Sequence, residues 1–196
     1  MSTTVVIVIV AVVAGLWGVG AYNRLVRLKN AIGNAFGQID VQLKRRYDLI
    51  PNLVEVARKY LSHEQDTLQA VIAARNHAKA AEATAAGSPL NAGALGALGA
   101  AETALTGAMG RLFAVAEAYP DLKADKTMSE LSEELTSTEN RIGFARQAYN
   151  DHVLEFNDAA AQFPTLIVAR LFGFNTQPML ESTQSEEERQ PVKVSF

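Results

Sequence analysis

VVIVIVAVVAGLWGVGA, residues 5–21, is the stretch that decides how this 196-residue chain is organised. It contains no charged residue and no proline. As a helix it would extend roughly 26 Å, slightly less than the ~30 Å hydrocarbon core of a bilayer, and Tyr22 can lengthen it. A secretory signal peptide is the competing interpretation. It is disfavoured because no Lys or Arg precedes the stretch and no clear small-x-small cleavage site follows. We predict a retained transmembrane anchor over residues 5–22.

The charges beside the anchor predict its orientation. Basic residues follow it at once, at Arg24, Arg27 and Lys29, and none precedes it. By the positive-inside rule, residues 1–4 form a short extracytoplasmic N-terminus and the remaining chain is cytoplasmic. Trp17 and Tyr22 stand near the same boundary, as interfacial aromatic residues do.

Small residues inside the anchor have the spacing that lets membrane helices approach closely. They form two pairs four residues apart, Ala11 with Gly15 and Ala14 with Gly18. One interpretation is that these pairs drive association of anchors. The other is that such pairs arise by chance in a span rich in alanine and glycine.

After the anchor, apolar residues recur at three- and four-residue steps, which predicts a continuing helix. This stripe comprises Leu25, Leu28, Ile32, Phe36, Ile39, Leu43, Tyr47 and Ile50. Pro51 should kink or restart the helix. Because the pattern resumes at Leu53, we expect one long, bent helix to about Ala86.

The middle of the chain is rich in alanine, glycine and leucine. Gly87-Ser88-Pro89 is a turn signal. The glycines at 93, 96 and 99 weaken the helical prediction there and favour a flexible hairpin. An apolar stripe from Leu105 restores the helix, and Tyr119-Pro120-Asp121 ends it.

The last third carries the clearest period. From Met128 to Phe163 seam residues alternate by three and four without a slip, which predicts a heptad seam of coiled-coil type. His152 lies on this seam, where a core role is favoured over a ligand role. Pro164 and Gly173 can begin and end a short helix. Residues 175–196 are expected to form a disordered polar tail.

No alternating apolar and polar run of strand type appears. The expected fold is all-α, with a single N-terminal transmembrane helix continuing into an antiparallel bundle of three or four long helices over residues 23–174.

Nothing in the sequence indicates chemistry. The chain has no cysteine, and its three histidines, His63, His77 and His152, are far apart and lack metal-binding spacing. No nucleophile, phosphate-binding or dinucleotide motif occurs. The net charge of −3 argues against nucleic acid as a partner. We expect no enzymatic activity, no cofactor, no metal site and no small-molecule substrate.

Two polar clusters flank the apolar stripes, one in residues 38–55 and one in residues 139–157. Buried polar groups need partners, so pairing between the clusters is the favoured interpretation. The alternative is a partner-protein or lipid-headgroup surface at Lys44, Arg45 and Arg46.

Four stretches resemble the LemA family: residues 22–36, residues 38–75 (QIDVQLKRRYDLIPNLVEVARKYLSHEQDTLQAVIAAR), residues 139–157 and residues 163–174. The resemblance implies an N-terminal membrane anchor, a cytoplasmic helical bundle and a bacterial origin, hence the cytoplasmic (inner) membrane. It implies no activity and no catalytic residue. The matching positions, which we expect to be structural or interaction residues, are Asp40, Lys44, Arg45, Arg46, Asp48, Pro51, Asn52, Glu55, Asn140, Arg141, Asn150 and Asn157.

Three functional hypotheses remain open. The first is a membrane-tethered scaffold that binds another membrane protein or forms a homo-oligomer. The second is a lipid-surface or membrane-remodelling protein. The third is an accessory subunit of a membrane protease or phosphatase.

Overall fold

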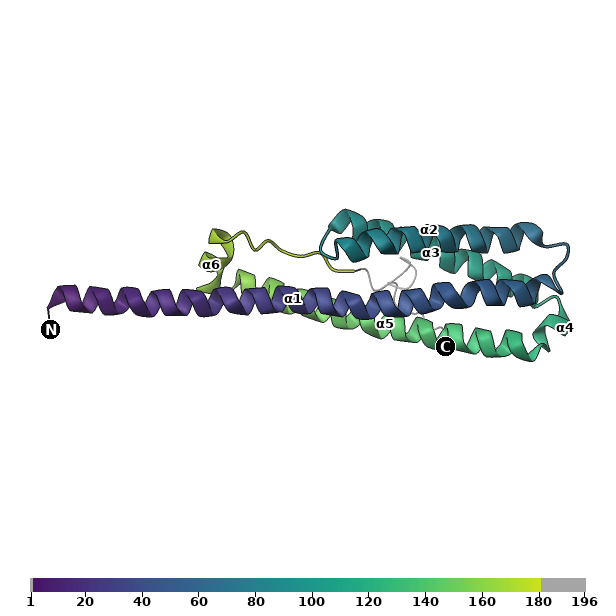
Figure 1. Cartoon of the computed structure of the whole chain (residues 1–196), viewed down its shortest axis with the longest axis horizontal. Helices are drawn as coiled ribbons and strands as arrows, with labels where there is room; N and C mark the ends of the chain where they lie inside the picture. Colours follow the sequence, from purple (N-terminus) through teal and green to yellow (C-terminus); the bar gives the residue numbers. More distant parts are fainter. Residues whose placement is uncertain (1, 181–196) are drawn as a thin grey trace, which may run out of the picture.

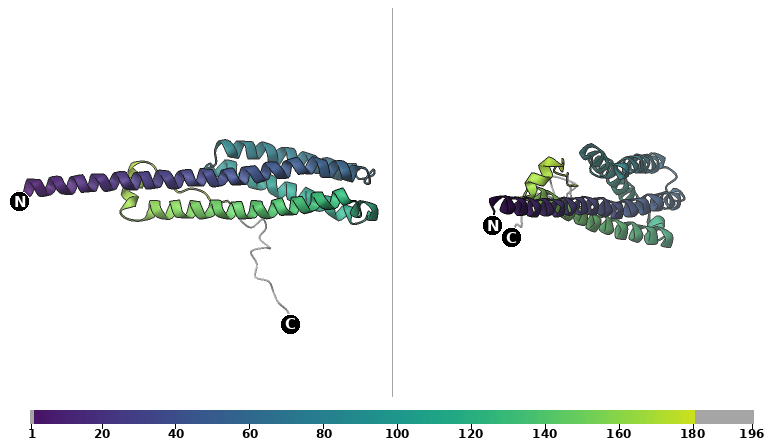
Figure 2. Two further views of the ribbon diagram at one scale, coloured as in Figure 1. Left: turned by 60° about the horizontal axis from the view of Figure 1, so that its bottom comes forward. Right: turned by 60° about the vertical axis from the view of Figure 1, so that its left-hand side comes forward.

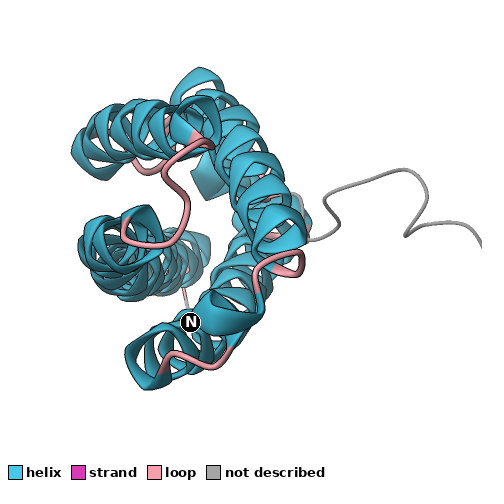
Figure 3. Ribbon diagram, turned by 90° about the vertical axis from the view of Figure 1, so that its right-hand side faces the viewer, coloured by secondary structure: helices cyan, strands magenta, loops and turns pink. Residues whose placement is uncertain are grey.

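The structure, a computed structural model, describes residues 2–180. Every regular element in this range is a helix, which confirms the all-α class. Four long helices lie side by side along the long axis of the molecule (Figures 1 and 3), and the N-terminal part of α1 projects beyond the others. The helices are α1 (Thr3–Arg58), α2 (Gln65–Gly87), α3 (Ala92–Ala116), α4 (Pro120–Lys123), α5 (Lys126–Ala161) and α6 (Thr165–Leu171).

Helix α1 contains both the predicted anchor and the start of the core. Its N-terminal part is long and apolar enough to cross a membrane, and almost none of it is buried against the rest of the protein. In residues 2–180 no other helix is long and apolar enough to cross a membrane. Burial begins at Ala21 and Leu25, where the predicted span ends. Within the described residues Ala11, Ala14 and Gly15 are exposed and Gly18 is half-buried, so their role in association stays a prediction.

The helix passes through Pro51 without ending. A proline has no backbone N–H, so the carbonyl of Tyr47, four residues earlier, loses its usual helical donor. Arg75 of α2 supplies a replacement, since its Nε donates to the Tyr47 carbonyl at 2.9 Å. A side chain from a neighbouring helix thus repairs the backbone gap that the proline creates.

The expected long helix to Ala86 is wrong, because α1 ends at Arg58 and α2 folds back from Gln65. No proline or glycine marks this turn. Tertiary contacts hold it instead: Leu61 is fully buried, and the Tyr60 hydroxyl donates to Asp125 before α5 at 2.9 Å. Folding back lets α2 bury Leu68 and Val71.

The flexible hairpin expected around residues 93–99 is also wrong. The predicted turn at Gly87-Ser88-Pro89 is present, but α3 already begins at Ala92. The Asn91 side chain accepts from the Ala94 amide at 3.0 Å and caps the helix. Leu95 and Leu98 are buried, so packing outweighs the low helix propensity of the glycines.

Helix α5 runs in the opposite direction to α1 and packs along it (Figure 2). Most of the predicted seam is buried, with Tyr149 and Phe156 at its centre. Two seam assignments are wrong. The His152 side chain is 43% exposed, 4.0 Å from Glu155, so it is not a core residue. Phe163 is 81% exposed, because α5 ends at Ala161.

Gly173 ends α6 as predicted. It has a φ of +69°, which a side chain disfavours. The Phe174 amide donates back to the Ala169 carbonyl at 2.9 Å, closing the C-terminal turn of the helix.

Residues 175–180, expected to begin a disordered tail, instead form an extended segment held by two asparagines of α5. Asn150 exchanges two hydrogen bonds of 2.8 Å with the backbone of Leu180. Asn157 does the same with Gln177, at 3.0 and 2.8 Å. Seven helical residues rise about 10.5 Å and three extended residues about 10 Å, so the two spacings match. Residues 181–196 of the expected tail, and Met1, lie outside the described residues.

We predict that Arg75→Ala destabilises the protein by about 1–3 kcal/mol, because it leaves the Tyr47 carbonyl without a donor. In a Pro51→Ala background the restored N–H serves that carbonyl, so the same change should cost less. Urea unfolding of the four proteins in detergent, followed by circular dichroism, measures this. Equal costs in both backgrounds would show that Arg75 does not compensate for the proline.

Candidate functional site

The most distinctive region of the body is a groove between α3 and α5. Helix α3 packs mainly on α2, whereas α5 packs mainly on α1. Helices α3 and α5 are therefore not packed tightly against each other. Three hollows of about 490, 320 and 220 Å³ follow one another along this gap. The segment 178–180 lines the first hollow, and Phe113 stands between the second and the third. We call this gap the α3/α5 groove.

A buried ion pair lies at the floor of the groove. Arg46 of α1 is 5% exposed and Glu102 of α3 is 1% exposed. The Arg46 guanidinium donates to the Glu102 carboxylate at 2.7 Å. The Tyr47 hydroxyl donates to the other oxygen of the same carboxylate at 2.6 Å. Glu102 therefore ties two consecutive residues of α1 to α3.

The same guanidinium also reaches α3 and α5 by other contacts. It donates to the Thr106 hydroxyl at 3.0 Å and lies 3.1 Å from the Glu139 carboxylate. Arg146 of α5 approaches Glu102 to 3.9 Å. We call these six residues, two arginines, two glutamates, Tyr47 and Thr106, the Arg46 network. Its two positive and two negative charges balance within the protein.

Burial and the neighbouring Glu102 carboxylate raise the pKa of Tyr47 far above its ordinary range. The phenol therefore stays protonated and remains a hydrogen-bond donor to Glu102 at any pH the protein meets. Tyr149 behaves similarly, since burial raises its pKa to about 12. Its hydroxyl donates to the Pro89 carbonyl at 3.0 Å.

A second charged cluster joins α1 to α2. Lys44 donates to Asp40 at 2.6 Å and lies 3.9 Å from Glu82, whose side chain is 3% exposed. Burial raises the pKa of Glu82 to about 7, the adjacent Asp40 carboxyl adds to this, and Lys44 and Lys79 oppose it. Burial opposes ionisation of Asp40 too, but hydrogen bonding with Glu82 and Lys44 lowers its pKa overall.

Within residues 2–180 no donor outside this pair of carboxyl groups reaches two of their buried oxygens, Asp40 Oδ1 and Glu82 Oε1. When Glu82 is protonated, its own O–H supplies the hydrogen-bond donor that the two carboxyl groups otherwise lack. This favours the neutral form of Glu82. Within residues 2–180 no group of three or more His, Asp or Glu side chains is placed to hold a metal ion.

The residues matched by the sequence analysis divide into three groups. Four of them form ion pairs: Asp40 and Lys44 pair with each other, while Arg45 reaches Glu134 and Arg46 reaches Glu102 on other helices. Asn150 and Asn157 hold the segment 177–180 and do not pair with α1. The remaining polar residues of the set lie at the surface, namely Asp48, which is 3.9 Å from Arg75, and Asn52, Glu55, Asn140 and Arg141.

The sequence analysis missed Glu82 and Glu102, the two most buried carboxylates of residues 2–180. Both come from the alanine-rich middle of the chain. A signal was present, because Glu102 continues the apolar stripe of Leu95, Leu98 and Leu105 at helical spacing. An acidic residue on a stripe that faces the core requires a buried partner.

We predict that Glu102→Ala destabilises the protein by about 3–5 kcal/mol, because it leaves the Arg46 charge buried beside an empty space. The matched control is Glu139→Ala, which also removes a carboxylate next to Arg46. The Glu139 side chain is 39% exposed, so its loss should cost about 1 kcal/mol or less. Denaturant unfolding measures both, and a similar cost for the two variants would contradict the assignment.

We also predict a pH dependence that comes from Glu82. Its pKa rises from an ordinary 4.5 to about 7 on folding, so the folded state holds the proton more tightly. The stabilisation is complete below pH 4.5 and is lost as the pH rises through about 7. Glu82→Gln should flatten this part of the profile. An unfolding midpoint of the wild-type protein that rises between pH 5 and pH 7.5, relative to Glu82→Gln, would contradict it.

Comparison with known proteins places these features in a family. The LemA family profile matches residues 35–196. The chain is 28% identical to Protein LemA of Metamycoplasma hominis over 177 residues, which cover 90% of this chain and 75% of that protein. It is 26% identical to Magnetosome protein MamQ of Magnetospirillum gryphiswaldense over 168 residues, or 78% of this chain and 62% of that longer protein. Since the matched residues include the Arg46 network and both asparagines of α5, and since they make up most of the chain, this protein belongs to the LemA family.

Proposed function

We propose that this LemA-family protein is a non-enzymatic, single-pass membrane scaffold. It holds a partner protein, or a second copy of itself, at a set distance from the cytoplasmic membrane. The observation that carries the proposal is that α1 runs without a break from Thr3 to Arg58. No flexible linker separates the candidate membrane span from the buried stripe that starts at Leu25.

The continuous helix gives the body a defined height above the bilayer. From Tyr22 to Arg58, α1 rises about 54 Å at 1.5 Å per residue. The four long helices act in this proposal as one rigid antiparallel bundle standing on the membrane. In a rigid arrangement of this kind, each surface feature is presented at its own distance from the lipid.

The charged groups support a structural and interaction role. The charges of Arg46 and Arg146 are balanced within the protein by those of Glu102 and Glu139. Two surface features are candidates for a protein contact: Phe113 beside the α3/α5 groove, and Phe144 on the outer side of α5. Phe144 is 73% exposed.

The lipid-surface alternative at Lys44, Arg45 and Arg46 is less well supported. Arg46 is buried, and the other two are paired with Asp40 and Glu134. This cluster also lies about 33–36 Å beyond Tyr22 along α1. The accessory-subunit hypothesis is a special case of the scaffold proposal, in which the partner is itself an enzyme.

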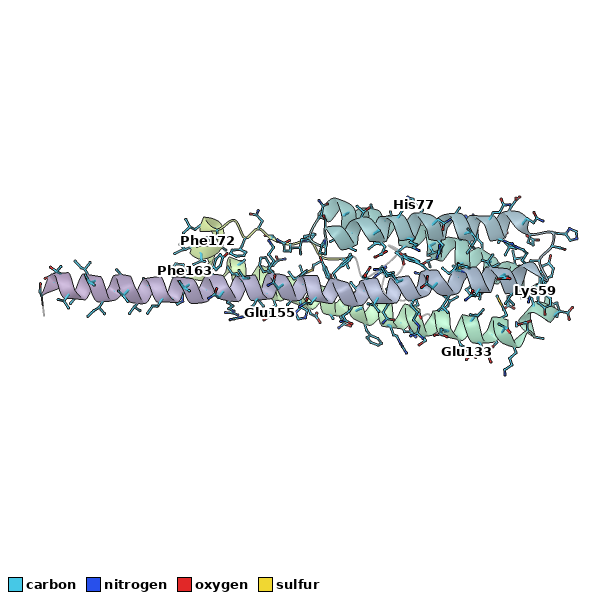
Figure 4. The ribbon with its side chains drawn as sticks, in the orientation of Figure 1. Lys59, His77, Glu133, Glu155, Phe163 and Phe172 are labelled. Atoms are coloured by element: carbon cyan, nitrogen blue, oxygen red, sulfur yellow. The ribbon has the colours of Figure 1, made fainter. Side chains whose placement is uncertain are left out.

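We predict that a photo-reactive phenylalanine analogue at position 113 or 144 cross-links to one discrete protein in native membranes. A protein interface contains aromatic anchors, and these two are the exposed phenylalanines of the long helices. Gel mobility and mass spectrometry identify whether the adduct contains another protein or a second copy. The control places the same analogue at Glu133, a charged surface position of α5 (Figure 4).

Two further measurements make the outcome decisive. The chain should remain in the membrane pellet after alkaline carbonate extraction, because the anchor spans the bilayer. Light scattering of the detergent-solubilised protein reports self-assembly. Extraction by carbonate would overturn the tether. A strict monomer that forms no adduct at either phenylalanine would overturn the scaffold.

A further inference from the structure

Large exposed apolar side chains gather at one place in the body, around α6. Phe163 is 81% exposed, Ile167 57%, Leu171 76% and Phe172 57%. Ile167 and Leu171 are four residues apart within α6 and therefore lie on one side of it, and Phe163 and Phe172 flank the helix at its two ends. We call these four residues the α6 stripe. Elsewhere in residues 23–180, exposed residues of this kind occur singly, as at Val41, Phe144 and Leu154.

The opposite side of α6 already packs on the body. Val168 and Ala169 are buried, and α6 contacts both α1 and α5. The short helix is therefore apolar on both sides, and its core contacts do not account for the α6 stripe. A group of exposed apolar residues of this size requires an apolar partner.

The α6 stripe lies at the level where the candidate membrane span ends. The ring of Phe172 packs against Tyr22 with 4.9 Å between centroids, and Phe174 packs against the same ring at 5.5 Å. Trp17, only five residues before Tyr22, belongs to the exposed apolar part of α1. The surface of the anchor and the α6 stripe are thus continuous.

The direction of α6 fits the same partner. Figures 1 and 2 show α6 crosswise to α1 at the end of the body nearer the N-terminus, and Figure 4 shows Phe163 and Phe172 at that end. If α1 crosses the bilayer along its normal, a helix crosswise to it lies in the membrane plane. Interfacial helices have this orientation and bury one apolar side among the lipids.

We propose that the α6 stripe inserts into the interfacial layer of the leaflet from which α1 emerges. The contact rests on the anchoring in the proposed function and adds a second point of attachment beside the anchor. Two attachments at one level restrict tilting of the body about Tyr22. The partner is the acyl and glycerol region of the bilayer, recognised through apolar burial.

Charge plays a smaller part in this contact. Arg170 on α6 and the exposed Arg24, Arg27 and Lys29 on α1 favour anionic headgroups. Glu155 and Asp158, exposed near the end of α5, oppose them. The insertion therefore persists in neutral phosphatidylcholine and at high salt, unlike an attachment made by basic residues.

The absence of cysteine permits a direct test with the full chain in phosphatidylcholine vesicles. Four variants each contain one cysteine: Ile167→Cys, Leu171→Cys, Phe144→Cys and Val12→Cys. An environment-sensitive fluorophore is attached to the cysteine of each variant. Lipids with brominated acyl chains act as quenchers. The wild-type side chains at 144, 167 and 171 are exposed, so these changes leave the fold intact, which circular dichroism checks.

The expected result is blue-shifted, quenched emission at positions 167 and 171, and unquenched emission at position 144. Quenching at position 12 alone would overturn the α6 contact and leave the anchor standing. Loss of quenching at position 12 as well would overturn the anchoring itself. Blue-shifted but unquenched emission at 167 and 171 would mean that protein covers the stripe. Equal quenching at 144 would mean that the whole body lies on the bilayer. Each of these last two outcomes overturns the proposal.

Discussion

A guanidinium buried inside a protein must be neutralised there, and Arg46 imposes this constraint on the body. It sits near the middle of the core stripe of α1, 5% exposed. Its partners come from two other helices, Glu102 and Thr106 from α3 and Glu139 from α5. Only one register of the three helices brings these groups to one point. The network therefore defines how the α2 and α3 pair sits on the α1 and α5 pair, across a groove that apolar packing does not close.

Helix α1 transmits this arrangement to the N-terminal end of the molecule. This helix contains the candidate membrane span, forms the centre of the core and carries Arg46 and Tyr47. Its one weak point is the missing hydrogen bond at Pro51, and Arg75 of α2 supplies the donor. The helix continues past Pro51 to Arg58, and α5 packs along it. At the other end Phe172 and Phe174 pack against Tyr22, so the body begins where the apolar span ends.

The groove and the extended segment after α6 are connected features. Asn150 and Asn157 bind the backbone of residues 177–180, which places Met179 and Leu180 at the first hollow beside Gly96 and Gly99. Glycines in α3 keep that hollow open, because no side chains project from these positions. The two asparagines are thus not part of a polar seam between helices, although they lie beside the heptad seam of α5.

The helical class, the apolar span with its basic boundary, the seam of α5 and the end of α6 at Gly173 could all be predicted from the sequence alone. All of these follow from local periodicity, charge or backbone preference. Four features depend on contacts between distant parts of the chain: the turn after Arg58, the helix through Gly93, the burial of Glu82 and Glu102, and the ordered conformation of residues 175–180. In each of these the energy comes from a distant residue, such as Asp125 for Tyr60 or Asn150 for Leu180. A local pattern contains no information about such a partner, and the position of α6 beside Tyr22 depends on distant contacts in the same way.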